Sequence, residues 1–302
     1  TLKWVESLQK HKLNLMIFSL FKPNKDYLIK YKILNVEVKT PNLREKIKTL
    51  RYPNISKIKY LYGLKQLNQI IKSYNPEILH AHYASSYGVL AFLSKKPFIL
   101  SVWGSDIFDF PNRNFFYKWL LRKVIFSAKA ICSTSHAMKK EIFHKYNRDD
   151  IQIIPFGVDI NLFYPNKDLS KNFVVGTIKS IEEHNGIDCL LDAASIIVNE
   201  NNKNDIQFLI VGKGSMLDQM RQKATTLNIN NHVEFTGMIP YDEIVNYHQK
   251  LSLFVAMSTR ESFGVAVLEA AACGVPAITS NVGGLPEVNK DKYIKYVNAF
   301  KY

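Results

Sequence analysis

Cysteine is scarce in this sequence, and its scarcity excludes two classes of protein. The 302 residues include three cysteines, Cys132, Cys189 and Cys273, scattered through apolar stretches. Disulfide-framed secreted proteins and zinc-binding modules carry closely and regularly spaced cysteines instead. We therefore expect three reduced cysteines in the core. No group of His, Cys and Asp has metal-ligand spacing, so the sequence predicts no metal site.

Long apolar runs and two cofactor signatures are also missing. No run reaches the about 18 apolar residues that a membrane-spanning helix needs. No G-x-G-x-x-G with a ribose-binding acid follows a predicted strand, which argues against a Rossmann dehydrogenase. No clear lysine site for a pyridoxal cofactor is present, which argues against a phosphorylase that depends on that cofactor.

Positive charge is concentrated in the first half of the chain. Residues 1–150 contain 27 Lys and Arg against 10 Asp and Glu, a net charge of +17; residues 151–302 contain 13 against 16, a net of −3. Two interpretations stay open: attraction to an anionic membrane surface, or a lysine-rich composition without a partner. Nucleic acid is not expected, because the lysines are spread and no aromatic-interleaved binding module is present.

Strand and helix patterns alternate along the chain, which indicates an α/β protein with parallel sheets covered on both faces. The predicted strands lie near 13–18, 33–38, 77–81, 97–102, 129–134, 151–154, 173–178, 206–211, 233–236, 251–257 and 275–279. The predicted helices lie near 58–74, 85–94, 114–126, 136–146, 186–200, 215–227, 241–249 and 264–273, and the first residues also have a helix-like pattern. An irregular run from Pro155 to Pro165 predicts a boundary between a domain at 1–164 and a second at 165–302.

The most informative stretch runs from Ser258 to Pro276. Glu261 follows a predicted strand and precedes Gly264, where an apolar, Ala-rich helix begins, and Glu269 lies inside that helix. Open α/β sheets bind ligands beyond the carboxyl ends of their strands, and a helix N-terminus attracts phosphate. Two acceptor-only carboxylates around an anion site suit a ligand with hydroxyls on both sides of a diphosphate, such as a nucleotide sugar. The alternative is a pair of surface glutamates, although a charge inside an apolar helix is costly without a partner.

Residues 173–287 resemble the donor-binding domain of the family 4 retaining glycosyltransferases of the GT-B fold. The family's E-x7-E, G-x-P and G-G-x-P-E patterns recur here at Glu261 to Glu269, Gly274 to Pro276 and Gly283 to Glu287. The resemblance extends more weakly over nearly the whole chain. It implies two Rossmann-like domains facing across a cleft, an N-terminal acceptor-side domain and a C-terminal donor-binding domain. It also leads us to expect truncation at both ends, with the first strand of the N-terminal domain missing.

The resemblance implies roles for residues around the donor. Glu261 would hold the sugar hydroxyls, Glu269 the ribose diol, and the backbone N–H groups from Phe263 to Val265 the diphosphate. Relatives place Arg or Lys where Lys179 stands, and Lys where His184 stands; a histidine there is mostly uncharged near neutral pH. The glycine turn Gly212-Lys213-Gly214 would pack near the base, or is only a tight turn. The expected donor-binding set is Lys179, His184, Gly212, Lys213, Gly214, Glu261, Ser262, Phe263, Gly264, Val265 and Glu269.

Polar residues also follow two strands of the first half. Trp103 stands where relatives often carry a histidine, and an indole cannot accept a proton. His82 and Asp106 are then the polar candidates, so the expected catalytic set is Glu261, Lys179, His82 and Asp106. His80 is expected to be a core histidine.

Together these expectations describe a metal-independent hexosyltransferase without a cofactor, whose co-substrate is a UDP- or GDP-linked sugar. The resemblance implies retention of configuration and a hydroxyl acceptor, which a lipid could carry, in cell-surface polysaccharide or glycolipid synthesis. A cytoplasmic protein peripheral to the inner face of the membrane would fit. The alternative is a catalytically impaired fragment that only binds nucleotide.

Overall fold

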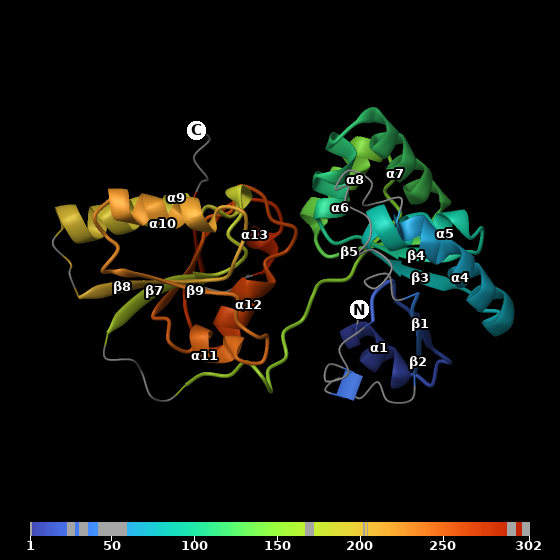
Figure 1. Cartoon of the computed structure of the whole chain (residues 1–302), viewed down its shortest axis with the longest axis horizontal. Coiled ribbons are helices and arrows are strands. Elements are labelled where there is room, and N and C mark those ends of the chain that lie inside the picture. Colours follow the sequence, from blue (N-terminus) through green and yellow to red (C-terminus); the bar gives the residue numbers. More distant parts are fainter. Residues whose placement is uncertain are drawn as a thin grey trace. The chain divides into compact units, whose positions relative to one another are not determined.

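The computed structural model describes residues 2–22, 28–29, 36–41, 59–166, 172–201, 203, 205–288 and 294–297. The chain divides into two compact units (Figure 1). Unit 1 comprises Thr1–Ser133 and Ile142–Gln152, and unit 2 comprises Thr134–Glu141 and Ile153–Tyr302. The boundary predicted after residue 164 lies later than this division, because Phe163 is buried in the core of unit 2. Within the described residues, no helix has both the length and the apolar character needed to cross a membrane.

Unit 2 is built on a six-stranded sheet with the order β12-β11-β10-β7-β8-β9, in which neighbouring strands are parallel. Its strands are β7 (Phe173–Ile178), β8 (Ile206–Val211), β9 (Val233–Gly237), β10 (Leu253–Ala256), β11 (Ala277–Ser280) and β12 (Ile294–Val297). From β7 the chain first moves outward through β8 to β9, and then returns to the other side of β7 with β10. The loops after β7 and β10 therefore diverge at the point where open α/β sheets bind ligands.

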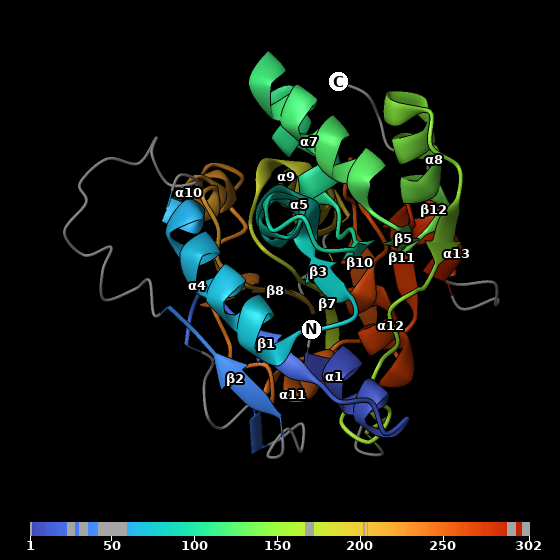
Figure 2. The same cartoon turned by 90° about the vertical axis from the view of Figure 1, so that its right-hand side faces the viewer.

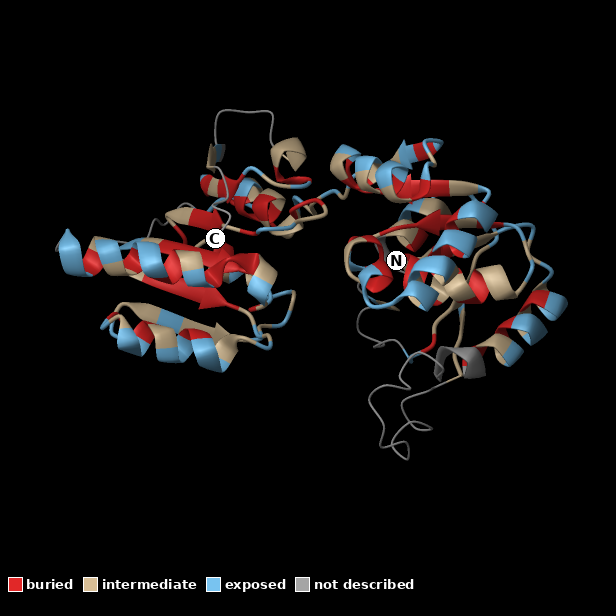
Figure 3. Cartoon of the chain, turned by 90° about the horizontal axis from the view of Figure 1, so that it is seen from above, coloured by how far each residue is buried: buried red, intermediate tan, exposed pale blue. Residues whose placement is uncertain are grey.

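Helices cover both faces of this sheet (Figure 1). They are η4 (Glu183–Asn185), α9 (Ile187–Ser195), which continues as a π-helical turn η5 (Ile196–Glu200), α10 (Leu217–Thr226), α11 (Ile244–His248), α12 (Val265–Ala272) and α13 (Leu285–Val288). Successive side chains of a strand point to opposite faces. Accordingly, Phe208 and Ile210 of β8 pack with α9 and α10, whereas Leu209 and Val211 pack with α11 and α12. This alternation gives unit 2 two cores, one on each face (Figure 3).

Unit 1 contains a parallel pair and a separate four-stranded sheet with the order β3-β4-β5-β6. Its strands are β1 (Met16–Phe18), β2 (Glu37–Lys39), β3 (Leu79–His82), β4 (Phe98–Ser101), β5 (Ala130–Ser133) and β6 (Ile151–Ile153), whose last residue belongs to unit 2. Its helices are α1 (Leu2–Gln9), α4 (Lys59–Tyr74), η2 (Tyr83–Gly88, a π-helix), α5 (Val89–Leu93), α6 (Ser105–Phe108), η3 (Phe110–Asn112) and α7 (Phe115–Ser127); α8 (His136–Tyr146) begins in unit 2 and ends in unit 1. Of the strand predicted at 33–38, residues 33–35 lie outside the described residues, as does residue 58 of the helix predicted at 58–74.

The predicted fold class, α/β with parallel sheets in two Rossmann-like units, is confirmed. The long helices and buried strands lie within a few residues of their predicted bounds. The short elements η3, α6, α13 and β12 were not predicted, because three or four residues are too short to show a hydrophobic period.

Candidate functional site

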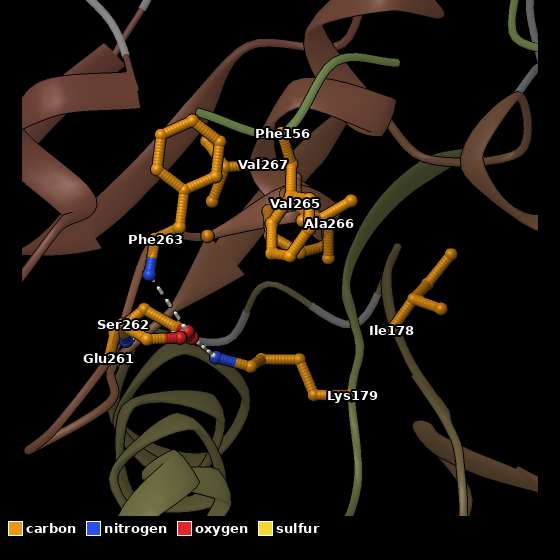
Figure 4. Close-up of a pocket in the computed structure, with 11 residues that line it drawn as sticks. Phe156, Ile178, Lys179, Glu261, Ser262, Phe263, Val265, Ala266 and Val267 are labelled. Carbon is orange, nitrogen blue, oxygen red and sulfur yellow. Dashed lines mark hydrogen bonds and ion pairs between the residues drawn. The ribbon is translucent and has the colours of Figure 1, made fainter. Parts of the chain in front are cut away.

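A cavity of about 210 Å³ lies in unit 2 where the loops after β7 and β10 diverge. Ile178 and Lys179 come from the end of β7, and Glu261 and Ser262 from the loop after β10 (Figure 4). The first turn of α12 forms one wall, and Phe156 another. The remaining lining residues are Phe254, Phe263, Gly264, Val265, Ala266 and Val267. The cavity therefore has mainly apolar walls and one charged end.

The charged end is a Lys179–Glu261 ion pair between residues 82 positions apart in the chain. The Lys179 Nζ lies 2.5 Å from the Glu261 Oε2 and donates a second hydrogen bond to the Ser258 Oγ at 2.7 Å. Both charged side chains are largely buried, with 11% and 17% of their area exposed. In such a largely buried pair, an anion that bound Lys179 would free the carboxylate to accept hydrogen bonds from other donors.

The backbone around Glu261 fixes this geometry. Its Oε1 accepts the N–H of Ser262 at 3.1 Å, and its carbonyl accepts the N–H of Gly284 from the glycine turn after β11. Gly264 precedes the first helical residue of α12 with φ at +103°, a conformation that side chains disfavour. Helix geometry leaves the first N–H groups of α12, those of Val265 and Ala266, without an acceptor in the helix, whereas the Val267 N–H donates to the Gly264 carbonyl at 3.0 Å. Val265 and Ala266 line the cavity. A lysine and a helix N-terminus therefore converge on one small space.

Glu269, the second glutamate of the motif, is buried elsewhere on α12 and is not among the residues that line the cavity. Its Oε1 accepts the Tyr241 hydroxyl at 3.3 Å, and its Oε2 lies 3.5 Å from the His248 Nε2. His248 is fully buried between Phe163 and Phe254. Tyr241 and His248 are thus the polar neighbours of this carboxylate inside unit 2, and its role toward a ribose stays a prediction.

The other predicted donor residues occupy the neighbouring loops. The Gly212-Lys213-Gly214 turn packs on the loop that carries Lys179, since the Ile181 N–H donates to the Lys213 carbonyl at 3.1 Å. The Lys213 side chain is exposed. The His184 carbonyl accepts the Thr259 N–H at 2.9 Å and so ties the turn after β7 to the loop after β10. Through these hydrogen bonds the glycine turn and the His184 backbone hold the loops after β7 and β10 in place, independently of any ligand.

Asp106 in unit 1 is fully buried, and its contacts give it a positioning role. Its Oδ2 accepts the Ala84 N–H at 2.7 Å, and its Oδ1 accepts the N–H groups of Trp103 and Gly104 at 3.1 and 2.9 Å. Burial raises the pKa of this carboxyl, and the backbone donors oppose that rise. Asp106 therefore joins the loops after β3 and β4. This geometry does not support the direct catalytic contact that we expected for it, since no part of the residue reaches the surface.

His82, the other predicted catalytic residue of unit 1, lies in an aromatic cluster. Its ring stacks on His80 with centroids 4.3 Å apart and meets Trp103 edge to face at 5.8 Å. His80 is partly buried and its Nε2 lies 2.8 Å from the Ser101 Oγ. Burial, and then the neighbouring His80, lower the pKa of His82 to about 3. At neutral pH the His82 ring is therefore uncharged, so it is not a proton donor there.

This lowered pKa predicts acid sensitivity of unit 1. Unfolding returns His82 to an ordinary pKa near 6.5, so between about pH 6.5 and 3 the unfolded state binds more protons than the folded state. The free energy of unfolding should therefore fall as pH falls through this window, by up to about 1.4 kcal/mol per pH unit from this group. His82→Phe keeps the stacking and removes the titration, so urea unfolding between about pH 7 and 4 should show a shallower slope. His11→Gln, an exposed control, should keep the wild-type slope; equal slopes for wild type and His82→Phe would contradict the assignment.

Sequence reasoning missed several residues of the site. The Ser258 hydroxyl oxygen accepts a hydrogen bond from the Lys179 ammonium, and Phe156 lines the cavity. Tyr241 and His248 contact Glu269. Only Ser258 carried a signal, because it follows β10 on the same loop as Glu261. Among the described residues, no group of His, Cys, Asp and Glu is arranged to hold a metal ion.

Comparison with known proteins gives two family matches. The model described as "Glycosyl transferase 4-like" matches residues 1–135, and the model described as "Glycosyl transferases group 1" matches residues 161–301. The two matches together cover most of the chain, and the second contains the whole Lys179–Glu261 site.

Individual relatives agree with these matches. An uncharacterised glycosyltransferase of Methanocaldococcus jannaschii is 28% identical over 292 residues, which are 93% of this chain and 78% of the relative. The UDP-Gal:alpha-D-GlcNAc-diphosphoundecaprenol alpha-1,3-galactosyltransferase of Escherichia coli is 30% identical over 257 residues, with 76% of this chain and 64% of the relative covered. The chain thus spans less than two thirds of that second relative. Among solved structures, Anabaena HepE in complex with UDP and glucose matches with a TM-score of 0.77 at 18% identity, over 98% of this chain and 81% of that one, a likeness of fold.

Proposed function

The chain belongs to the glycosyltransferase 4-like enzymes of the GT-B fold, and from this premise we propose that it transfers a hexosyl-type group from a nucleotide diphosphate sugar to a hydroxyl acceptor with retention of configuration. The observation that carries the proposal is the Lys179–Glu261 pair beside the N-terminus of α12. One cation, one carboxylate and a helix N-terminus converge where a donor with a diphosphate and sugar hydroxyls needs them.

Binding of the donor would break the Lys179–Glu261 ion pair and give each of the two side chains a new contact with the donor. Its diphosphate would take the Lys179 ammonium and the first N–H groups of α12, and the freed Glu261 carboxylate would accept hydrogen bonds from sugar hydroxyls. Leaving-group charge is what sugar transfer must stabilise, and preorganised donors do so best. These groups would neutralise the diphosphate without a metal ion. The names of the relatives support a UDP-linked donor, since one uses UDP-Gal and a structural neighbour holds UDP; GDP stays an alternative.

Retention follows if the acceptor arrives on the face from which the diphosphate leaves. The bond between the anomeric carbon and the diphosphate oxygen breaks, and a bond to the acceptor oxygen forms on the same side. The acceptor proton passes to an oxygen of the departing diphosphate, so no protein base is required. Asp106 and the uncharged His82 would shape the loops of unit 1 rather than move this proton.

The acceptor side of the proposal is a lipid-linked sugar at an anionic membrane surface, in polysaccharide or glycolipid synthesis at the cytoplasmic face. Its support is the diphosphoundecaprenol acceptor in the name of the Escherichia coli relative, together with the net charge of +17 in residues 1–150.

A panel of nucleotide sugars tests the proposal. We expect one class of UDP- or GDP-sugar to raise the melting temperature and to be turned over with release of the nucleoside diphosphate. Glu269→Ala should weaken binding of that diphosphate in calorimetry by roughly 1.5–3 kcal/mol, the contribution of a charged hydrogen bond. The control Glu243→Ala removes an exposed carboxylate of the same unit and should bind as wild type. No stabilisation by any member of the panel would overturn the proposal, and binding without turnover would favour a nucleotide-binding protein without transferase activity.

A further inference from the structure

Helix α7 of unit 1 exposes aromatic side chains on its outward face. Phe115 is 83% exposed, Phe116 59%, Trp119 46% and Phe126 49%. The helix lies at the outer edge of unit 1 in two perpendicular views (Figures 1 and 2). Single exposed apolar residues are ordinary on protein surfaces, but four large aromatics on one 13-residue helix form a patch.

The spacing shows that this patch is a continuous stripe. Phe115, Trp119 and Phe126 are separated by four and seven residues, and such positions share one side of an α-helix. The opposite side is also apolar, since Leu121, Val124 and Ile125 are buried in the core of unit 1. A helix on the surface of a protein that contacts only water has polar residues on its outward side. The outward side of α7 departs from this pattern because large aromatic rings stand among its polar residues.

The stripe is accompanied by positive charge only. Lys118, Arg122 and Lys123 are the charged residues of α7, and the helix contains no acid. The Arg122 guanidinium lies 5.1 Å from the centre of the Phe126 ring, and the Lys123 ammonium 5.8 Å from that of Trp119. Aromatic rings at the level of lipid headgroups, with basic side chains beside them, are the composition of helices that lie in the interface of an anionic bilayer.

We propose that the outward face of α7, formed by Phe115, Trp119, Phe126, Lys118, Arg122 and Lys123, is the surface with which this protein docks on an anionic lipid bilayer. The rings enter the boundary between headgroups and acyl chains, and the basic side chains reach back to lipid phosphates. The positive charge of the patch favours an anionic bilayer over a second copy of the same helix, which would bring like charges together. Contact with water alone would not account for the aromatic stripe. The inference rests on the membrane binding in the proposed function, and it assigns that binding to the outward face of α7.

Vesicle binding by the full chain tests the location. Partitioning is measured by flotation with phosphatidylcholine vesicles that contain about one-third phosphatidylglycerol, and with phosphatidylcholine alone. The variant K118Q/R122Q/K123Q should bind the anionic vesicles on the order of 10²-fold more weakly, since each basic residue near the surface contributes a factor of about five. The variant F115S/W119S/F126S should bind at least about tenfold more weakly.

A matched control separates α7 from the general basicity of unit 1. K65Q/K72Q/K95Q removes the same charge from exposed positions outside α7 and should weaken binding by less than about fivefold, because charges outside the docking face add only screened, long-range attraction. Equal losses in K118Q/R122Q/K123Q and K65Q/K72Q/K95Q would overturn the proposal. Trp119 also reports depth: vesicles with brominated acyl chains should quench wild-type fluorescence but not that of Trp119→Phe, whose remaining tryptophans are Trp4 and Trp103.

The remaining outcomes also decide the question. Unaltered vesicle binding of the aromatic variant, or no binding by the wild type, refutes the docking surface; a concentration-dependent dimer in sedimentation that F115S/W119S/F126S abolishes would identify a second copy as the occupant instead. The α7 variants should melt close to wild type and bind nucleoside diphosphate normally, because the replaced side chains are exposed and none of them lines the cavity. Failure of the transferase proposal would leave vesicle binding intact, so the two failures are distinguishable.

Discussion

Replacing Glu261 by alanine is expected to lower kcat for sugar transfer by on the order of 10² or more, with a smaller effect on KM. A contact that strengthens as the sugar moves toward the transition state contributes mainly to kcat, and losing one preorganised partner of this kind costs that much. The same change removes the carboxylate from the Lys179 ammonium, which lies in a largely buried position and keeps its hydrogen bond to the Ser258 Oγ. Initial rates over a range of donor concentrations separate the two constants.

Two further variants make this prediction specific. Glu261→Gln keeps the shape of the side chain and removes the charge, so an intermediate loss is expected. Glu183→Ala removes an exposed carboxylate near the same loops and should leave both constants unchanged. Wild-type turnover of Glu261→Ala, with melting temperatures equal across the series, would show that the carboxylate does not contact the reacting sugar.

The position of this site followed from the sequence, because two simple rules place it. Buried strands end where their apolar run ends, and the carboxyl ends of parallel strands meet on one edge of the sheet. Lys179 and Glu261 each follow such a strand, and β7 and β10 are neighbours in the sheet. Their ion pair is therefore a consequence of topology, although 82 positions separate them.

Side-chain direction could not be derived in the same way. A pattern of residue types places Glu269 on α12 but does not say that it turns toward Tyr241 and His248. Asp106 has the sequence context of a polar loop residue, yet three backbone N–H groups of two separate loops draw it into the interior. Both outcomes depend on contacts distant in sequence, which local propensity and period do not contain. The aromatic face of α7 was hidden for the same reason, since only the fold shows which side of an apolar helix is buried.

The largest expected effect on stability comes from Gly212→Ala, at the turn that supports Lys179. Gly212 has φ at +143°, and a Cβ added there would lie 1.9 Å from the Lys179 carbonyl oxygen. The Gly212 N–H donates to the Gly237 carbonyl at 2.9 Å. This hydrogen bond limits how far the turn can move away from the Lys179 carbonyl. Backbone strain costs about 1–3 kcal/mol, and forcing a group into packed space costs about as much again. We expect the free energy of unfolding of unit 2 to fall by roughly 2–6 kcal/mol.

The same substitution should also reach the site, because whichever way the turn relaxes it displaces the backbone of Lys179. Binding of nucleoside diphosphate should weaken even at temperatures where Gly212→Ala is folded. Gly157→Ala is the matched control: no atom of the described structure lies within 4 Å of an added Cβ at that position, and the change should alter stability by less than about 0.5 kcal/mol. Melting curves and calorimetry of the two variants decide the matter. Equal stability and equal nucleotide affinity would mean that the glycine turn does not determine where Lys179 lies, and the cavity would then owe its charged end to the Glu261 loop alone.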